Sequence, residues 1–223
     1  MTGPRALRRQ QIDQQILDLG RAQLAEVGAA ALSVRAIARE LGMVSSAVYR
    51  YVDSRDELLT RLVVAAYTDL ADAVRRAVDA DSGDAVARLA AAAHGFRRWA
   101  LDHPTEFALL YGSPVPGYHA PPERTNEPGT RVIAILLGLI AEAAGDAAPT
   151  VPAALNDDLS RIADEFGHTL SPGTVLNALG LWTWLIGAVG QEVTGGLGTD
   201  TFTDPAAAFD AQLTRQLTLV VPA

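Results

Sequence analysis

Hydrophobic side chains recur along this chain with the spacing of an amphipathic helix. Residues 5–27 carry them on one side, and Gly28 follows as a typical helix end. Ser33 is expected to cap a second helix, whose stripe over residues 34–41 keeps the i, i+3, i+4, i+7 spacing, and Gly42 ends it. No stretch longer than a few residues alternates with the two-residue period of a strand. The pattern therefore predicts an all-α fold.

A short polar helix and then a long helix are expected next. The short one covers about residues 44–52, and Ser54-Arg55-Asp56-Glu57 is typical of a capping box that starts a helix reaching about residue 80. Residues 112–129 contain five prolines and are predicted to be a loop. The remaining helices are expected at about 84–103, 104–111, 130–144, 152–169, 172–193 and 205–219, several of them beginning at a proline.

Composition narrows the class of protein. A chain of 223 residues that is 49% hydrophobic can form one large domain, alone or with a small one. It contains no cysteine, which excludes disulfides and thiolate metal sites and indicates no oxidising compartment. Polar residues follow the first arginines where a signal peptide would be apolar. We therefore expect a cytoplasmic protein.

The charge is distributed unevenly along the chain. The net charge is -8, which by itself argues against a nucleic-acid partner. Residues 1–60, however, carry a net charge of +1, so the acidity lies in the rest of the chain, at -9. All 18 basic residues are arginine, which suits forked contacts with phosphate, although a GC-rich genome would produce the same bias.

One segment has nearly the length of a membrane span. Residues 172–190 contain no charged side chain. The same segment holds Asn177 and four glycines, and no arginine flanks it. These features favour a helix buried in protein, and no membrane contact is expected.

Residues 33–52 combine two short helices with a glycine turn, which is the helix-turn-helix arrangement, whose second helix lies in the major groove of DNA. Ser45, Ser46 and Tyr49 would let that helix donate and accept hydrogen bonds at base edges. On spacing alone an alternative stays open, in which the serines only begin a helix and the tyrosines are half-buried packing.

The run SVRAIARELGMVSSAVYRYVDSRDELL, residues 33–59, resembles the DNA-binding segment of the tetracycline-repressor (TetR) family. Shared features are the glycine turn, a tyrosine with an aromatic residue two positions later, and a Ser-basic-x-Glu-Leu sequence. The resemblance implies phosphate contacts at Ser33, Tyr49, Tyr51 and Arg55, base contacts at Arg35, Ser45 and Ser46, and a basic N-terminal arm with Arg5, Arg8 and Arg9.

Two positions depart from the family pattern. Val44 stands where the family usually has a capping serine, so Ser45 is expected to cap the short helix and start it one residue later. Ser46 stands where a glycine is common, which changes how closely the backbone can approach DNA. The implied organisation is a DNA-binding domain over residues 1–55 and a helical ligand-binding and dimerisation domain over residues 56–223.

The second half also resembles one part of this family. FRRWALDHPTEFALLYGSPVPGY, residues 96–118, is similar to a subgroup whose ligand domain carries Trp, His-Pro and Pro-Gly at these places. The family implies a cavity for a small apolar or amphipathic effector. Large side chains with few polar groups are its expected lining, each with plain core packing as the alternative: Trp99, Phe107, Tyr111, Phe166, His168, Trp182 and Trp184.

Dimerisation through the last two long helices is implied as well. The helix over residues 172–193 has one side with small residues that permits close helix approach. We predict that this side meets a second copy of the chain, through Leu176, Gly180, Thr183 and Gly187. A two-fold dimer would place two short helices in successive major grooves, so the operator should be an inverted repeat in double-stranded DNA.

An enzyme and a helical scaffold are the two other classes of function for this sequence. An enzyme needs convergent catalytic groups, but the histidines are scattered, and Glu165-x-x-His168 supplies one of the two such pairs that a di-iron site requires. No enzyme activity, metal or cofactor is therefore expected. A helical scaffold without DNA binding is made less plausible by the basic arm together with Tyr49, Ser54 and Arg55.

Overall fold

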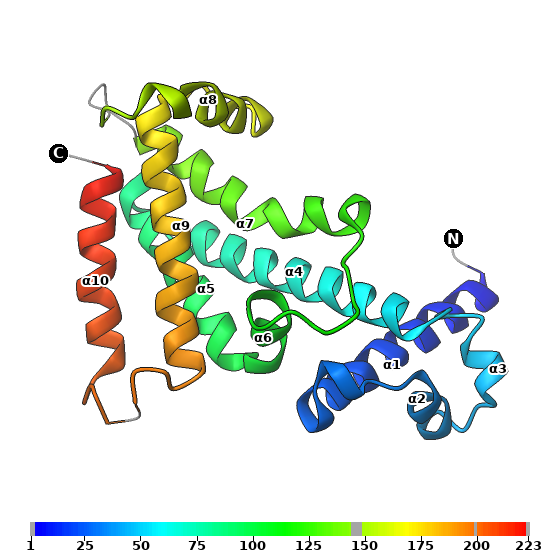
Figure 1. Cartoon of the computed structure of the whole chain (residues 1–223). Coiled ribbons are helices and arrows are strands. Elements are labelled where there is room, and N and C mark those ends of the chain that lie inside the picture. Colours follow the sequence, from blue (N-terminus) through cyan, green and yellow to red (C-terminus); the bar gives the residue numbers. More distant parts are fainter. Residues whose placement is uncertain (1–2, 144–148, 199, 222–223) are drawn as a thin grey trace. The chain divides into compact units, whose positions relative to one another are not determined.

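A computed structural model describes residues 3–143, 149–198 and 200–221. All regular elements in these ranges are helical, which confirms the predicted fold class (Figure 1). The α-helices are α1 (Pro4–Val27), α2 (Val34–Glu40), α3 (Ser45–Val48), α4 (Arg55–Ala80), α5 (Ala85–Asp102), α6 (Pro104–Tyr111), α7 (Pro122–Ala143), α8 (Asn156–Glu165), α9 (Pro172–Val193) and α10 (Pro205–Val220). Short 3-10 turns, η1 (Ala29–Ala31) and η2 (Ala153–Leu155), precede α2 and α8.

The described residues form two compact units. The first combines the chain up to Thr68 with His103–Gly129, and the second combines Asp69–Asp102 with the chain from Thr130 onward. Both α4 and α7 therefore begin in the first unit and end in the second. The domain boundary expected after residue 55 coincides with the start of α4, which lies inside the first unit.

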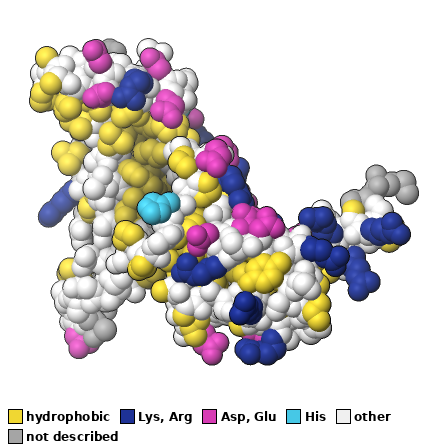
Figure 2. Space-filling view, turned by 45° about the vertical axis from the view of Figure 1, so that its right-hand side comes forward, with side chains coloured by type: hydrophobic (Ala, Val, Ile, Leu, Met, Phe, Trp, Pro, Cys, Tyr) yellow, Lys and Arg dark blue, Asp and Glu magenta, His cyan; other side chains and the backbone are white. Residues whose placement is uncertain are grey.

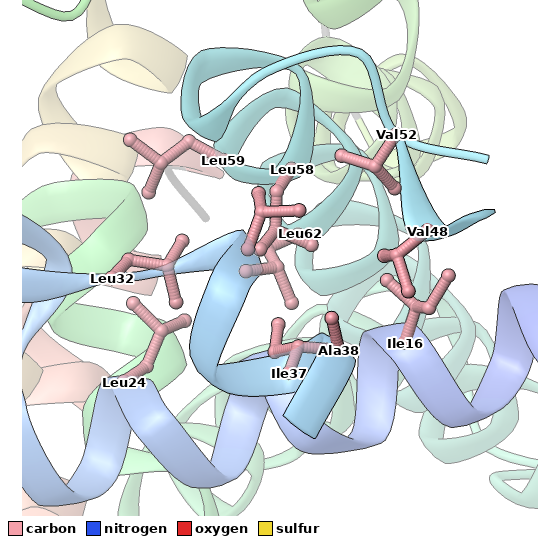
Figure 3. Packing of buried hydrophobic residues seen from close by; sticks show 11 residues of the cluster. Ile16, Leu24, Leu32, Ile37, Ala38, Val48, Val52, Leu58, Leu59 and Leu62 are labelled. Carbon is pink, nitrogen blue, oxygen red and sulfur yellow. The ribbon is translucent and has the colours of Figure 1, made fainter. Parts of the chain in front are cut away.

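A single hydrophobic cluster holds the short helices of the first unit (Figure 3). A helix as short as α2 or α3 is not stable in isolation, because its nucleation is unfavourable. Burial of each Leu or Ile side chain contributes ~1.5 to 3 kcal/mol, which offsets that cost. The cluster draws side chains from α1, α2, α3, the first turns of α4 and the segments before α2 and after α3: Ile16, Leu24, Leu32, Val34, Ile37, Ala38, Val48, Val52, Leu58, Leu59 and Leu62.

Serine caps begin two of these helices as the sequence indicates. Ser33 Oγ accepts a hydrogen bond from the Ala36 N–H at 3.3 Å, and Ser54 Oγ accepts one from the Glu57 N–H at 3.0 Å. The second half of the predicted capping box is not formed, since the Glu57 carboxylate instead pairs with Arg61 and Arg124. Two guanidinium groups attract that carboxylate more strongly than one backbone N–H does.

The proline-rich segment ends sooner than its composition predicts. Residues 112–129 were expected to be a loop, but α7 begins at Pro122 and contains Pro128. A proline in the first turn removes an N–H that has no helical partner, so Pro122 fits there. Pro128 removes one hydrogen bond inside the helix. The N–H groups of Arg124 and Thr125 both donate to the Pro121 carbonyl and close the first turn.

In the second unit, α9 packs against α5, α8 and α10. By length and composition α9 passes as a membrane span, with 39% of its most apolar window buried. Contact with three neighbouring helices is the environment of a core helix. Its fully buried side chains follow one face of the helix: Val175, Ala178, Leu181, Leu185 and Val189.

Candidate DNA-binding surface and ligand cavities

The single turn of α3 has one buried and one exposed side. Val48 is 0% exposed and lies in the hydrophobic cluster. Ser45 and Ser46 are exposed, and Tyr49, which follows the helix, is 38% exposed. Burial of Val48 thus fixes the turn so that hydroxyl and phenol groups point to solvent, where base edges or phosphates could meet them.

One detail of this helix differs from the prediction. Ser45 was expected to cap α3, but Val44 occupies the N-cap position and no side chain caps the helix. Ser45 is the first helical residue, and the N–H of Ala47 donates to the Val44 carbonyl. The backbone at Val44 is extended (φ -67°, ψ 141°), as a cap position requires, so Val44 itself precedes the first helical residue.

Ser33 and Arg35 lie at the start of α2. The Ser33 hydroxyl caps the helix, and the backbone N–H of Ser33 donates to Gln23 Oε1 on α1 at 3.0 Å. Arg35 is exposed at the second position of α2. The helix start is therefore anchored to α1, with a cation beside it.

Arg55 makes contacts within the protein that the sequence did not predict. Its Nη2 donates to the carbonyl oxygens of Ala29 at 2.8 Å and Ala30 at 3.3 Å, and its Nη1 lies 3.3 Å from an Asp56 carboxylate oxygen. These bonds connect the first turn of α4 with η1. A phosphate contact by Arg55 remains a prediction. The same guanidinium would then bind a phosphate as well as the Ala29 and Ala30 carbonyls.

Four arginines form a cationic hollow in the first unit. Arg5, Arg8, Arg9 and Arg50, with Tyr51, line a cavity of about 420 Å³. The Arg9 guanidinium lies over the Tyr51 ring, 5.8 Å from its centroid. Figure 2 shows dark blue side chains gathered near the start of the chain. Such a hollow attracts phosphate.

Arg50 was not among the predicted DNA contacts. The sequence places it beside Tyr51, near the end of the predicted short helix, and that adjacency was the available signal. Its contribution to the hollow depends on how α1 packs, which the local pattern does not reveal.

Two of the predicted ligand residues lie in the first unit. The rings of Phe107 and Tyr111 lie 5.2 Å apart, and Tyr67 meets Tyr111 edge-on at 6.2 Å. Burial raises the pKa of the Tyr111 phenol well above its ordinary value, and burial also raises the pKa of Tyr67. Both phenols therefore remain neutral hydrogen-bonding groups near neutral pH.

The other five lie in the second unit. Trp99 is buried, Trp182 meets Phe96 edge-on at 5.6 Å, and Trp184 stacks on Phe209 at 5.4 Å. Phe166 follows α8, and the His168 ring lies against Gly138 of α7. The seven residues are thus distributed over both units.

Trp184 lines a cavity of about 520 Å³ between α9, the segment that follows it, and α10. The stacked Trp184 and Phe209 rings form an aromatic wall. Arg97 Nε donates to a Glu192 carboxylate oxygen at 2.7 Å, and its guanidinium lies 5.3 Å from the Phe209 centroid. Phe209 was not predicted to bind ligand. The lining also includes Gln191, Leu197, Phe202 and Gln212.

All four residues of the predicted dimer stripe are exposed in the single chain. Leu176 is 39% exposed. A Cβ atom added at Gly180 or Gly187 would meet no atom within 4 Å. This side of α9 is therefore free to receive another helix.

Comparison with known proteins decides the family. Residues 16–62 match the family described as bacterial regulatory proteins, tetR family, and residues 89–216 match the family described as tetracyclin repressor-like, C-terminal domain. The chain belongs to the TetR family of transcriptional regulators. The family resemblance of the sequence is confirmed.

Relatives of this TetR-family regulator match it over nearly their whole length. It is 51% identical to HTH-type transcriptional regulator Rv1816 of Mycobacterium tuberculosis over 228 residues, which cover 98% of this chain and 96% of the relative. Identity and coverage are the same for HTH-type transcriptional regulator Mb1846 of Mycobacterium bovis. The crystal structure of regulatory protein SCO4313 is 36% identical, has a TM-score of 0.79, and the match covers 96% of this chain and 99% of that one.

Members of the TetR family are DNA-binding transcriptional regulators and not enzymes. The chain is therefore a DNA-binding transcriptional regulator. Within the described residues, no three His, Asp or Glu side chains gather as they would around a metal ion. Among the residues that the structure describes, Glu165 and His168 therefore belong to no group of three or more such ligands.

Proposed function

We propose that this TetR-family regulator is a cytoplasmic, homodimeric repressor that binds an inverted-repeat operator and releases it when a small apolar or amphipathic effector binds. The observation that carries the proposal is the two-sided turn of α3. Val48 is fully buried, while Ser45, Ser46 and Tyr49 face solvent. A helix built in this way can present hydrogen-bonding groups to the major groove without disturbing the core.

Charge supports the same role. The cationic hollow of Arg5, Arg8, Arg9 and Arg50 can bind the phosphate backbone and align the protein on the duplex. Two copies related by a two-fold axis would place their α3 helices ~34 Å apart, in successive major grooves. The operator should therefore consist of two half-sites of opposite direction.

Selection of bound DNA from a random pool tests this proposal. The full-length protein should recover an inverted repeat. Ser46→Ala should relax the base preference within each half-site, since a lost base contact changes affinity by ~1 to 3 kcal/mol. Ser160→Ala, at an exposed position of α8, is the matched control and should recover the same sequence as the unmodified protein.

Failure to recover any preferred sequence would contradict operator binding. That result would favour the alternative function, a helical ligand-binding or scaffold protein that does not read DNA. Recovery of single half-sites without symmetry would contradict the dimer and leave the role of α3 standing.

The aromatic side chains of Trp184 and Phe209 support binding of such an effector. The cavity beside Trp184 has a stacked aromatic wall and includes Gln191 and Gln212 in its lining, which suits a ligand with an apolar body and a polar group. An effector that binds the DNA-free conformation more tightly than the DNA-bound one weakens operator binding by the difference between those two binding free energies, typically ~1 to 3 kcal/mol.

Graded series of linear alcohols and planar aromatic acids can serve as probes. Fluorescence anisotropy of a labelled operator would identify a compound that releases the DNA. The same titration with Trp184→Ala should then need more of that compound. An unchanged titration would show that Trp184 is not part of the effector site. Release of the DNA only by charged compounds without an apolar part would contradict an apolar or amphipathic effector.

A further inference from the structure

The first two turns of α4 have two different sides. Leu58, Leu59 and Leu62 lie in the hydrophobic cluster that contains Val48 of α3 (Figure 3). Glu57, Thr60 and Arg61 lie elsewhere on the same turns and make polar contacts. Any displacement of these turns is therefore transmitted through packed side chains to the helix that carries Ser45 and Ser46.

Glu57 is held by two cations. Arg124 Nη1 donates to its Oε2 at 2.5 Å, and Arg124 Nη2 donates to its Oε1 at 3.3 Å. Arg61 Nε donates to Glu57 Oε1 at 2.7 Å, while Arg61 Nη1 reaches Asp13 of α1 at 3.2 Å. The network joins α1, α4 and α7, and the forked contact fixes the direction of Arg124.

A second bond lies one turn away. The Tyr118 phenol and the Thr60 hydroxyl are 3.0 Å apart, and Thr60 is only 3% exposed. Thr60 Oγ1 also lies 2.9 Å from the Asp56 carbonyl, to which it donates, so Tyr118 is the donor to Thr60. Tyr118 also packs against the hydrophobic cluster. The segment 118–124 is thus attached to α4 at two points.

The helix that carries Arg124 continues into the second unit. Its first turn belongs to the first unit, and Val132, Leu136 and Ile140 on the same helix are buried in the second unit. A change in the position of α7 therefore acts on the pair between Arg124 and Glu57. None of the family's predicted DNA or ligand contacts includes these two residues.

We propose that Arg124 and Tyr118 are positioning residues, which hold the first turns of α4 in the orientation that lets α3 recognise the operator. The proposal rests on the proposed operator binding and adds a regulatory contact to it. Without the ion pair between Arg124 and Glu57, α4 samples other orientations. The apparent affinity for the operator then falls in proportion to the fraction of protein that remains in the binding-competent orientation.

Operator binding by full-length variants tests the proposal. With a labelled duplex recovered by selection, Arg124→Gln should weaken binding about three- to fivefold, as expected for a partly exposed ion pair. Glu57→Gln should weaken it similarly, and the double variant should be no weaker than either single variant. Arg124→Lys should fall between Arg124→Gln and the unmodified protein. Arg161→Gln, which removes an exposed pair with Asp158, is the control and should bind normally.

Tyr118→Phe provides a second measurement, because it removes only the hydroxyl and keeps the packing. It should weaken operator binding about two- to threefold, with the order of preferred half-sites unchanged. Urea unfolding of each variant separates this effect from lost stability, since a positioning role lowers the affinity of fully folded protein.

The outcomes separate the two proposals. If the unmodified protein binds no preferred DNA, operator binding itself fails. If it binds and Arg124→Gln binds equally well, the positioning role is wrong. Losses that simply add in the double variant also overturn it, because independent residues give additive effects.

Discussion

At the scale of single residues, contacts between neighbours in the sequence could be predicted, whereas contacts between distant residues could not. Ser33 and Ser54 cap their helices as predicted, because a cap depends on residues two or three positions away. Arg124 and Glu57 are 67 residues apart, and no local pattern announces their pairing. For the same reason the carbonyl contacts of Arg55 and the place of Arg50 in the cationic hollow were not predicted.

Tyr49→Phe should weaken binding to all DNA sequences alike. The resemblance assigns the Tyr49 hydroxyl to phosphate, and a phosphate contact carries no base information. Loss of one such hydrogen bond should cost ~0.5 to 1.5 kcal/mol, measured by fluorescence anisotropy on specific and random duplexes. Tyr67→Phe, which alters a half-buried phenol of α4, is the control. A change in base preference would instead place Tyr49 at a base edge.

The stabilisation by Glu57 should depend on pH. Hydrogen bonding from Arg124 lowers the pKa of the Glu57 carboxyl below its ordinary value of 4.5, Arg61 lowers it further, and partial burial opposes both. A lowered folded-state pKa means that the contribution is present above pH 4.5 and is lost as pH falls through the folded-state pKa.

Urea unfolding of the unmodified protein and Glu57→Gln measures this contribution. The difference between their free energies of unfolding should be larger at about pH 7 than at about pH 3. Equal differences at both pH values would show that the carboxylate charge does not stabilise the fold.

At the scale of elements, hydrophobic periodicity and proline positions predicted most helices. The structure begins α6, α9 and α10 at Pro104, Pro172 and Pro205, because a missing N–H is harmless in a first turn. The same reasoning failed for α7, since five prolines in one segment obscured the helix that starts at Pro122. Propensity alone does not reveal that buried residues further along α7 stabilise a helix containing Pro128.

Helix contact in the second unit depends on one glycine. A Cβ atom at Gly95 of α5 would lie 2.8 Å from the Ala77 Cβ and 3.3 Å from the Val74 Cα. Gly95→Ala should therefore destabilise the protein by ~1 to 3 kcal/mol through overpacking. Gly138→Ala is the matched control, as its nearest atoms lie 3.8 Å away, and it should be neutral or stabilising by ~0.5 to 1 kcal/mol. Thermal unfolding compares the two, and equal effects would contradict the close approach.

At the scale of the whole molecule, charge and exposed surface bear on assembly. The chain is anionic overall at -8, and DNA binding must rely on a locally cationic surface, so operator affinity should fall steeply with salt. The exposed stripe of α9 leaves open space at Gly180 and Gly187 for a second helix to approach. The spacing of these residues in the sequence predicted the stripe, and a dimer formed through it stays a prediction.

Gly187→Trp should prevent dimerisation. The added side chain meets no atom of its own protomer near the Cβ position, so the chain should still fold, although Gly187 also lines the cavity beside Trp184 and the indole would alter that cavity as well. In a dimer that uses this stripe, an indole would hold the two helices apart. Sedimentation velocity should therefore detect monomers. Ser160→Trp, at an exposed position of α8, should leave the assembly unchanged. A dimer that persists with Gly187→Trp would place the interface elsewhere.

Pro128 has a consequence for the motions of α7. Because proline has no N–H, the carbonyl of Arg124, four residues earlier, lacks its helical donor. The turn before Pro128 therefore has one helical hydrogen bond fewer than the turns around Leu136, while Arg124 stays bonded to Glu57. Deuterium should therefore enter the backbone amides of residues 126–127, next to Pro128, before those of residues 132–140, so that local opening of α7 would be confined to one turn.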